Sequence, residues 1–316
     1  MFTKHSTAED VTAGLDLNGK NIVITGINSG IGHEAMRVLA MRGAHVIALA
    51  RTLEKAQGAC ATVNGKTTPL ACELSDLSSV KKCAEAIIEM DLPIDALICN
   101  AGIMALPDLR VKDGLEMQFL TNHMGHFLLV YLLQDAVKAA AKGRIVMLSS
   151  EAHKMTVKGG INFNNLDGSH GYHPWKFYGQ SKLANLLTAI AFDERLKSAG
   201  VRANGLHPGV INTNLVREMD GVLGFLIKLP FSGWVLDRVG KTIPKGASTE
   251  CYVATHPDAA DIGGKYFSDN AVADSSYYGR NLELANQLWD YSVDYLKPYL
   301  QQVSTEAQPK EAATTG

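Results

Sequence analysis

The sequence lacks an excess of charge of either sign, because its 30 Lys and Arg residues face 32 Asp and Glu residues. Nucleic-acid-binding proteins usually carry a basic surplus, so this balance gives no support to a nucleic-acid partner. Hydrophobic residues make up 46% of the 316 residues and charged residues 20%, which excludes a disordered chain and is typical of a globular protein. The length allows one large domain or two small ones.

Cysteine is also scarce, and no two cysteines show the C-x-x-C spacing of many zinc sites and redox motifs. The five cysteines are Cys60, Cys72, Cys83, Cys99 and Cys251. An odd number without paired spacing indicates reduced thiols in the core rather than disulfides or a zinc site. Reduced thiols are typical of a reducing compartment, and we expect the protein to be cytoplasmic.

Long hydrophobic runs are absent as well, since none approaches the ~20 residues that a membrane span needs. The first ten residues, MFTKHSTAED, contain no apolar core, so they do not form a signal peptide. The segment 221–236 (GVLGFLIKLPFSGWVL) is apolar but carries one lysine and an internal proline. We interpret it as a lid over an apolar substrate; a pair of packed helices and a peripheral membrane contact are the alternatives.

Short apolar runs alternate with helical patterns along most of the chain. The runs cover residues 21–25, 45–50, 68–74, 96–100, 144–149, 201–206 and 264–267. Apolar strands that are each followed by a helix are typical of a parallel sheet covered on both faces. The sequence therefore predicts an α/β protein with a Rossmann-like, doubly wound, seven-stranded parallel sheet in three α/β/α layers. One domain spans 17–300 and includes the lid segment within 221–245, between a flexible N-terminus (1–16) and a disordered tail (301–316).

A glycine-rich turn, TGINSGIG, follows the first predicted strand at residues 25–32. Gly26, Gly30 and Gly32 allow a tight turn and a close approach of the backbone to a pyrophosphate. The helix that follows offers free N–H groups and a partial positive charge to that anion. The spacing G-x-x-x-G-x-G differs from the common G-x-G-x-x-G fingerprint, and a purely structural turn is the alternative.

The end of the second predicted strand bears on which dinucleotide binds. An NAD-selective site usually places an acidic residue there to bond the ribose 2′-hydroxyl, whereas this chain has Arg51. A guanidinium can form charge-assisted hydrogen bonds to the 2′-phosphate of NADP. The sequence therefore favours NADP over NAD, although Glu54 is a contrary signal and Arg51 could be a solvated loop charge.

The pattern Tyr-x-x-x-Lys occurs twice, as Tyr172/Lys176 and as Tyr178/Lys182. Residues four apart share one helix face, so the ammonium can lie near the phenol. Pro174 suits the first turn of a helix, which places Tyr172 before the helix and the second pair inside it. Lowering a phenol pKa from near 10 by about three units needs roughly 4 kcal/mol, which a lysine and an oxidised nicotinamide could supply. Two ordinary surface residues are the alternative.

These features together resemble the short-chain dehydrogenase/reductase superfamily. Residues 25–32 match its TGxxxGIG turn, 100–102 its NAG motif and 178–182 its YxxxK motif, while Ser150 ends the fifth strand as the family serine does. Residues 122–127 (NHMGHF), 181–185 (SKLAN) and 207–209 (HPG) resemble the retinol dehydrogenase and WW-domain oxidoreductase branch, without the WW domains. The resemblance covers residues 17–300.

The resemblance implies the catalytic roles. Tyr178 would act as general acid in reduction and general base in oxidation, and Lys182 would lower its pKa and hold the nicotinamide ribose. Ser150 would bond the substrate oxygen, with Ser149 as the alternative because the spacing to Tyr178 is longer than in the simplest members. Asn122 would support a water that links Lys182 to solvent.

The resemblance also implies a set of cofactor-binding residues. They are Gly26, Asn28, Ser29, Gly30, Ile31, Gly32, Arg51, Glu73, Leu74, Asn100, Ala101, Gly102, Tyr178, Lys182, Pro208, Gly209, Ile211 and Thr213. The usual Asp-Leu that meets the adenine appears here as Glu73-Leu74, with Asp76 as the alternative. The histidine pairs at 123/126 and 170/173 lack an evident third ligand, so we expect no metal.

The implied function is that of an NADP-preferring, metal-independent dehydrogenase or reductase. Its substrate would be an apolar alcohol, aldehyde or ketone of the retinoid, steroid or lipid-aldehyde kind. The alternatives are a C=C reductase of the protochlorophyllide type, a non-catalytic NADP-binding regulator and an epimerase-like enzyme. We expect no membrane span, and the sequence does not distinguish a monomer from a homodimer.

Overall fold

The computed structural model describes residues 2–210 and 240–300. Three sets of predicted residues lie outside these ranges: Ile211 and Thr213, the lid segment up to residue 239, and the tail 301–316. Their roles stay predictions.

An eight-stranded sheet forms the centre of the molecule, in the order β10-β9-β8-β7-β4-β1-β2-β3. Its strands are β1 (Asn21–Thr25), β2 (His45–Ala50), β3 (Thr67–Ala71), β4 (Ala96–Cys99), β7 (Arg144–Leu148), β8 (Arg202–His207), β9 (Tyr266–Ser268) and β10 (Ala271–Ala273). All neighbours pair in parallel except β9 and β10. The chain order reverses between β1 and β4, and in such sheets ligands bind beyond the carboxyl ends of the strands at that point.

The predicted count of seven parallel strands is wrong by one edge strand. After β9 the chain turns through Asp269 and Asn270, both with positive φ (53° and 64°), and returns antiparallel as β10. A second hairpin, β5 (Val111–Lys112) with β6 (Leu115–Glu116), turns through Asp113 and Gly114 in the same way. Two-residue turns with positive φ match the twist of paired strands, which explains both hairpins.

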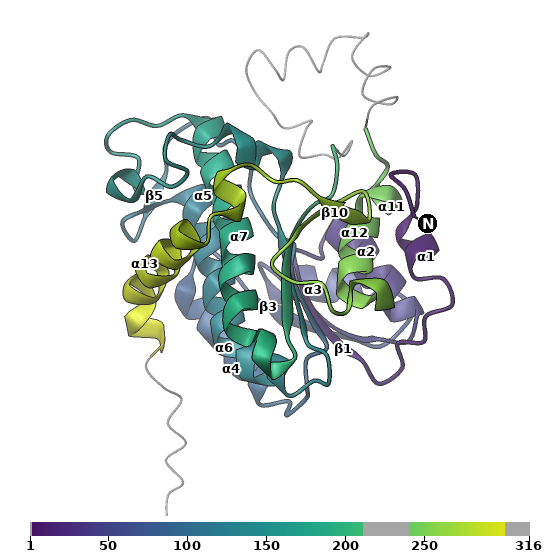
Figure 1. Ribbon diagram of the computed structural model, residues 1–316. Coiled ribbons are helices and arrows are strands. Elements are labelled where there is room, and N and C mark those ends of the chain that lie inside the picture. The colour runs from purple at the N-terminus through teal and green to yellow at the C-terminus, as the bar shows by residue number, and fades with distance from the viewer. Residues whose placement is uncertain (1, 211–239, 301–316) are drawn as a thin grey trace, which may run out of the picture.

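Helices cover both faces of the sheet, which confirms the three-layer α/β/α prediction (Figure 1). One face carries α4 (Leu77–Ile88), α6 (Gly125–Lys138) and α7 (Pro174–Leu196), with α13 (Leu282–Leu300) packed on α7. The other face carries α2 (Gly30–Met41), α3 (Leu53–Cys60), α11 (Ile243–Gly246) and α12 (Ser248–Thr255). Each layer encloses its own cluster of buried apolar side chains, so the sheet is apolar on both faces.

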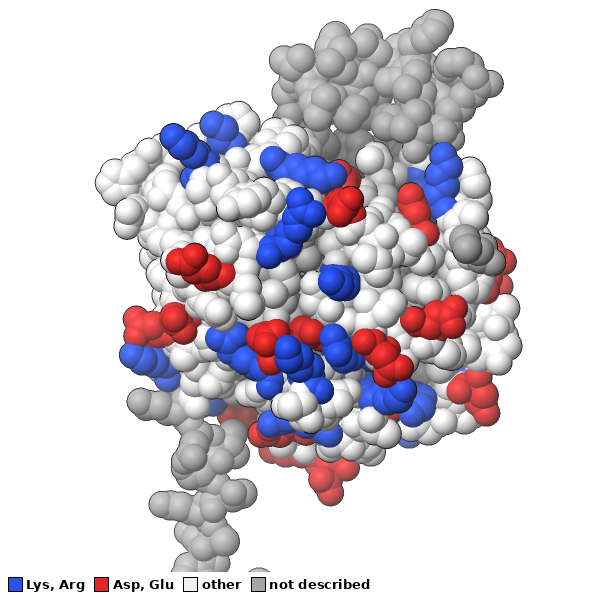
Figure 2. All heavy atoms as spheres, viewed as in Figure 1, with Lys and Arg blue, Asp and Glu red and all other residues white. Residues whose placement is uncertain are grey.

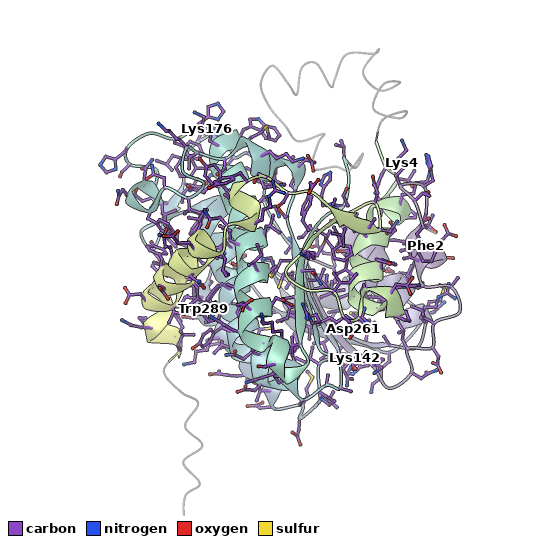
Figure 3. All side chains as sticks on the ribbon, in the orientation of Figure 1. Phe2, Lys4, Lys142, Lys176, Asp261 and Trp289 are labelled. Atoms are coloured by element: carbon purple, nitrogen blue, oxygen red, sulfur yellow. The ribbon has the colours of Figure 1, made fainter. Side chains whose placement is uncertain are left out.

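The N-terminal residues, predicted to be flexible, contain one short helix. Helix α1 (Ala8–Val11) begins with a capping box between Thr7 and Asp10. Ala8 and Val11 are buried in the cluster that also contains α2 and α12. The ring of Phe2, labelled in Figure 3, meets the ring of Tyr252 edge-on at 5.9 Å. These apolar contacts hold the segment against the domain, and the polar composition of residues 1–18 concealed them.

The charge on the surface and the hydrophobicity of the helices both bear on the sequence predictions. On the face shown in Figure 2, basic and acidic side chains are interspersed over the surface. Among the helices in residues 2–210 and 240–300, none is long and apolar enough to cross a membrane.

Candidate active site

The site is built where β1 and β4 end side by side. The hydroxyl of Thr25, the last residue of β1, accepts hydrogen bonds from the backbone N–H groups of Asn100 and Ala101, both at 3.0 Å. The Asn100 amide Nδ2 donates to the carbonyl oxygen of Thr25 at 2.8 Å. Asn100 therefore joins the glycine-rich turn to the end of β4, and its side chain is committed to this joint.

Glycine is required at two positions of this turn. Gly26 has φ +76°, and a Cβ added there would lie 2.9 Å from the Cα of Ala101. A Cβ added at Gly32 would lie 2.2 Å from Nδ2 of Asn100. Both substitutions would push the turn away from β4, because neither neighbour can move without breaking its own hydrogen bonds.

The helix after the turn leaves its first amides available. Helices α3 and α4 begin with side-chain caps, from Thr52 and Asp76 respectively. Ser29 stands at the same position of α2, but within the described residues its side chain makes no cap bond. Uncapped N–H groups at a helix N-terminus favour an anion. The arrangement fits the pyrophosphate of a dinucleotide, with Asn28 and Gly30 beside Ser29 in the same loop.

Helix α7 positions the predicted phenol and ammonium. It begins at Pro174, as predicted, so Tyr178 and Lys182 lie within the helix and on one face. Both side chains are buried, and Nζ of Lys182 lies 5.8 Å from the centre of the Tyr178 ring. The ammonium donates to the carbonyl oxygen of Leu148 at 3.1 Å, which ties α7 to the end of β7.

Burial dominates the electrostatics of this pair. Burial raises the pKa of Tyr178 to about 12, against the opposing effect of a hydrogen bond with Ser150. Burial also lowers the pKa of Lys182 to about 8. The expected depression of the phenol pKa is therefore not supplied by the protein's own groups, because the cost of burying a phenolate exceeds their stabilising effect.

The structure distinguishes the two candidate serines. The Ser149 hydroxyl is buried and donates to the carbonyl oxygen of Lys182 at 2.8 Å, so it anchors the helix. Ser150 is half-exposed and caps the short helix η2 (Glu151–Met155), and its hydroxyl is near enough to Tyr178 to lower the pKa of the phenol, against the larger effect of burial. Ser150 is thus the serine whose hydroxyl acts on the phenol.

Asn122 lies in a π-helical turn, η1 (Leu120–Met124), just before α6. Its amide oxygen accepts from the N–H of Ile103 at 2.8 Å, and its Nδ2 donates to the carbonyl of Ile103 and to the hydroxyl of Ser181, both at 2.9 Å. The Asn122 side chain therefore clamps the loop after β4 to α7. A Cβ added at Gly102 would lie 3.1 Å from Oδ1 of Asn122 and 3.2 Å from Nζ of Lys182, so these two atoms border the same space.

The outer end of the site contains the predicted selector of the cofactor. Arg51 follows β2 with its side chain 65% exposed, and its Nε lies 3.4 Å from Oε2 of Glu73. Glu73 also accepts from the N–H and the hydroxyl of Ser75. Asp76, the alternative contact to the adenine, instead caps α4 by accepting from two backbone N–H groups. Glu73 and the buried Leu74 are therefore the pair at this edge of the site.

The remaining predicted residues extend the site. Ile31 is half-buried in the first turn of α2, and Pro208 and Gly209 follow β8. Gly209 has φ +98°, and the Lys241 side chain packs against it. No group of three His, Cys, Asp or Glu side chains that could hold a metal ion occurs in residues 2–210 and 240–300.

Sequence reasoning missed several residues of the site. The Thr25 hydroxyl and Ser181 complete the hydrogen bonds of Asn100 and Asn122, and the Tyr266 hydroxyl donates to Glu151 beside Ser150 at 2.9 Å. Thr25 and Ser181 stand inside the TGINSGIG and SKLAN motifs, which gave a signal for them. No comparable signal marks Tyr266, because its partner is remote along the chain.

The family model described as short chain dehydrogenase matches residues 20–221 of the chain. The chain belongs to the short-chain dehydrogenase family. Its members act as NAD(P)-dependent oxidoreductases, and this chain is one of them.

The relatives place this short-chain dehydrogenase near the retinol dehydrogenases, as predicted. It is 36% identical to human retinol dehydrogenase 11 over 290 residues, which covers 90% of this chain and 88% of that protein. It is 43% identical to the short-chain dehydrogenase TIC 32 A, chloroplastic, of Brassica napus, with coverage of 91% and 92%. A crystal structure of an uncharacterised protein from Mycobacterium Paratuberculosis superposes with a TM-score of 0.72 at 31% identity, covering 91% of this chain and 97% of that one.

Proposed function

We propose that this short-chain dehydrogenase prefers NADP and transfers hydride between the nicotinamide and the carbonyl or alcohol carbon of an apolar small molecule. One observation carries the proposal: Tyr178, Ser150 and Lys182 converge at the carboxyl end of β7, with Asn122 fixed beside them. A phenol and a hydroxyl that lie beside each other can both bond one substrate oxygen.

The residues present fit a nicotinamide dinucleotide. The uncapped start of α2 suits the pyrophosphate, and a Cβ added at Gly30 would meet nothing within 4 Å, so the backbone there is open to the anion. Lys182 and Tyr178 would hold the nicotinamide ribose, in the space that Gly102 borders. When bound, NADPH supplies the hydride.

The protein's own groups manage the proton. With a pKa of about 12, Tyr178 is protonated at neutral pH and can donate to an oxygen that gains negative charge during reduction. Ser150 stabilises the same oxygen by a second hydrogen bond. The Lys182 ammonium then faces the phenolate that Tyr178 leaves behind, and their attraction is strong because both groups are buried. In oxidation these transfers run in reverse.

Cofactor preference rests on Arg51. An exposed ion pair such as Arg51–Glu73 contributes about 0–1 kcal/mol, so it can open at little cost when a 2′-phosphate arrives. A phosphate offers the guanidinium two charge-assisted hydrogen bonds. We expect Arg51→Asp to lower kcat/KM for NADPH by about 10-fold or more relative to NADH, which corresponds to roughly 1.4 kcal/mol.

Lys55→Asp is the matched control, because it makes the same charge change on an exposed residue of α3. The ratio of kcat/KM for NADPH to that for NADH, measured with one substrate, reports the effect. An Arg51→Asp ratio equal to that of the control would refute Arg51 as the selector.

The apolar segment 221–236 and the name of retinol dehydrogenase 11 support an apolar substrate. A screen of NADPH oxidation over retinoid, steroid, fatty and aromatic aldehydes and ketones, with NADH in parallel, tests this. We expect several apolar carbonyl compounds to be reduced and small polar sugars not to be. Absence of turnover with every compound under both cofactors would contradict the proposed reaction.

We further propose a reducing compartment, the cytoplasm, for this protein. All five cysteines are free and buried. Because TIC 32 A is named as chloroplastic, microscopy of the tagged protein should include plastids; a signal confined to an organelle would refute the cytoplasmic assignment.

A further inference from the structure

His126 lies one helical turn after Asn122, is fully buried, and reaches two parts of the site at once. Its Nδ1 lies 2.8 Å from the carbonyl oxygen of Asn122. Its Nε2 lies 2.9 Å from the hydroxyl oxygen of Thr25, at the end of β1. The imidazole therefore bridges the π-helical turn η1 and the first residue of the glycine-rich loop.

The partners determine which ring nitrogen carries the proton. A carbonyl oxygen can only accept, so Nδ1 of His126 must donate to Asn122. The Thr25 hydroxyl oxygen already accepts from the N–H groups of Asn100 and Ala101, so its own proton is directed to Nε2. Burial lowers the pKa of His126 to about 4, and the ring stays neutral at physiological pH. Each atom of the bridge thus has one role, and reversing any bond would leave a buried group unsatisfied.

We propose that His126 is a positioning residue that couples the dinucleotide-binding turn to the Asn122–Lys182 side of the active site. It does so through the continuous path Asn100/Ala101 N–H to Thr25 hydroxyl to His126 to Asn122 carbonyl. This inference rests on the proposed function for its kinetic consequences. The path itself is independent of the substrate. A cofactor that displaces the glycine-rich turn would therefore also displace Asn122, and a displacement of Asn122 would in turn move the glycine-rich turn.

A neighbouring histidine provides the contrast. His123 is equally buried, but its Nε2 lies 3.1 Å from the hydroxyl of Ser292 and its Nδ1 3.3 Å from the hydroxyl of Thr188. These partners belong to α13 and α7, away from the glycine-rich turn. His123 therefore joins helices, and its loss should lower stability without changing the cofactor site selectively.

Another histidine repeats the arrangement at the catalytic serine. Nδ1 of His153 lies 2.6 Å from the carbonyl oxygen of Ser150, and its Nε2 accepts from the N–H of Ser276 at 3.0 Å. Like His126, it holds the backbone of an active-site residue, but its second partner is a loop that is not part of the dinucleotide turn. His153 variants should therefore change turnover with little effect on NADPH affinity.

Two conservative variants separate the two halves of the His126 bridge. In His126→Asn the side-chain amide nitrogen can replace Nδ1 and keep the bond to Asn122. In His126→Gln the longer side chain places an amide oxygen near the former Nε2, where it can accept from Thr25. His126→Phe removes both bonds while it keeps an aromatic ring in the buried space.

The experiment measures the Kd for NADPH by fluorescence titration, together with kcat on the best substrate of the screen. We expect His126→Phe to raise the Kd about 10-fold, the effect of losing roughly 1.4 kcal/mol. The Kd of His126→Gln should lie within about threefold of the wild-type value. The Kd of His126→Asn should be higher than that of His126→Gln, although His126→Asn should retain more of the wild-type kcat. His123→Asn should lower the Tm without changing the Kd. A wild-type Kd in His126→Phe, or equal losses in the Gln and Asn variants, would overturn the coupling.

A measurement without substrate distinguishes this inference from the proposed function. In two-dimensional ¹H–¹⁵N spectra of histidine-labelled protein, His126 should show a protonated Nδ1, an unprotonated Nε2 and no titration between pH 5 and 8. A protonated Nε2 would refute the bridge even in an active reductase. If the spectra and the Kd values agree with the bridge while no carbonyl compound is reduced, the proposed reaction fails and the coupling stands.

Discussion

Two Tyr-x-x-x-Lys pairs begin six residues apart along the chain, and the structure places them in opposite environments. Tyr172 precedes α7; its hydroxyl donates to the carbonyl of Leu106 and accepts from Gln118. Lys176 is exposed at the outer end of the helix (Figure 3). Tyr178 and Lys182 lie one to two turns further on, buried beside Ser150 and the end of β7.

The difference shows that spacing brings a phenol and an amine onto one face, whereas burial and the remaining partners decide what they can do. The Tyr172 hydroxyl already donates its hydrogen bond to the carbonyl oxygen of Leu106, and burial raises the pKa of Tyr172 as well. Only the inner pair combines a low-dielectric environment, a serine partner and a space bordered by Gly102. Pro174, which begins the helix between the two tyrosines, is the residue that separates them.

The largest contrast should appear in turnover. Tyr178→Phe removes the proton donor, and we expect kcat to fall at least ~100-fold, a much larger effect than the change in the Kd for NADPH that follows from losing one contact to the ribose. Tyr172→Phe is the matched control, since it deletes the same atom from the outer pair, and it should change kcat less than about threefold. Steady-state NADPH oxidation measures both. Equal losses in the two variants would remove the distinction between the pairs.

The two serines sharpen the comparison on the substrate side. Ser150→Ala should lower kcat about 10- to 100-fold, because it removes one hydrogen bond to the developing oxyanion. Ser149→Ala instead removes the bond to the Lys182 carbonyl and should lower the free energy of unfolding by about 1 kcal/mol. Measuring kcat and chemical denaturation on both variants separates these roles. A larger loss of kcat in Ser149→Ala than in Ser150→Ala would show that Ser149, and not Ser150, bonds the substrate oxygen.

The lysines should differ in stability and in its pH dependence. Lys182 has its folded pKa lowered to about 8 from 10.5, so its burial penalty is fully present below pH 8 and disappears as the pH rises to 10.5. Lys182→Met should therefore be inactive yet more stable than the wild type at pH 7, by roughly 1–3 kcal/mol.

That stability gap should close between pH 8 and 10.5, measured by urea denaturation at a series of pH values. Lys176→Met, the exposed control, should show a small difference that does not vary with pH. A gap for Lys182→Met that stays constant over this range would contradict the burial of a charged amine.

Much of this arrangement could be read from the sequence, because it depends on local chemistry. The seven apolar runs became strands, and Pro174 alone sufficed to place the second pair inside the helix. The hairpins at 112–115 and 268–271 were missed although Asp-Gly and Asp-Asn are turn signals. There the strands are so short that the apolar pattern that revealed the others is lacking.

The rest depended on contacts between remote segments. The pairing of Ser150 with Tyr178, the anchoring of Ser149 and the bond from His126 to Thr25 each join residues from different elements. The raised pKa of Tyr178 follows from its burial, and the four-residue spacing of Tyr178 and Lys182 does not show how deeply the pair is buried. The contacts of Ile211 and Thr213 stay predictions from the family resemblance.

The most direct test of the account is a crystal structure of the protein with NADPH and an unreactive analogue of its best carbonyl substrate. We expect the analogue's oxygen to lie within about 3 Å of both the Tyr178 hydroxyl and the Ser150 hydroxyl, with the Lys182 ammonium on the ribose. An analogue oxygen bound to Tyr172, or a Tyr178 hydroxyl turned away from it, would contradict the account.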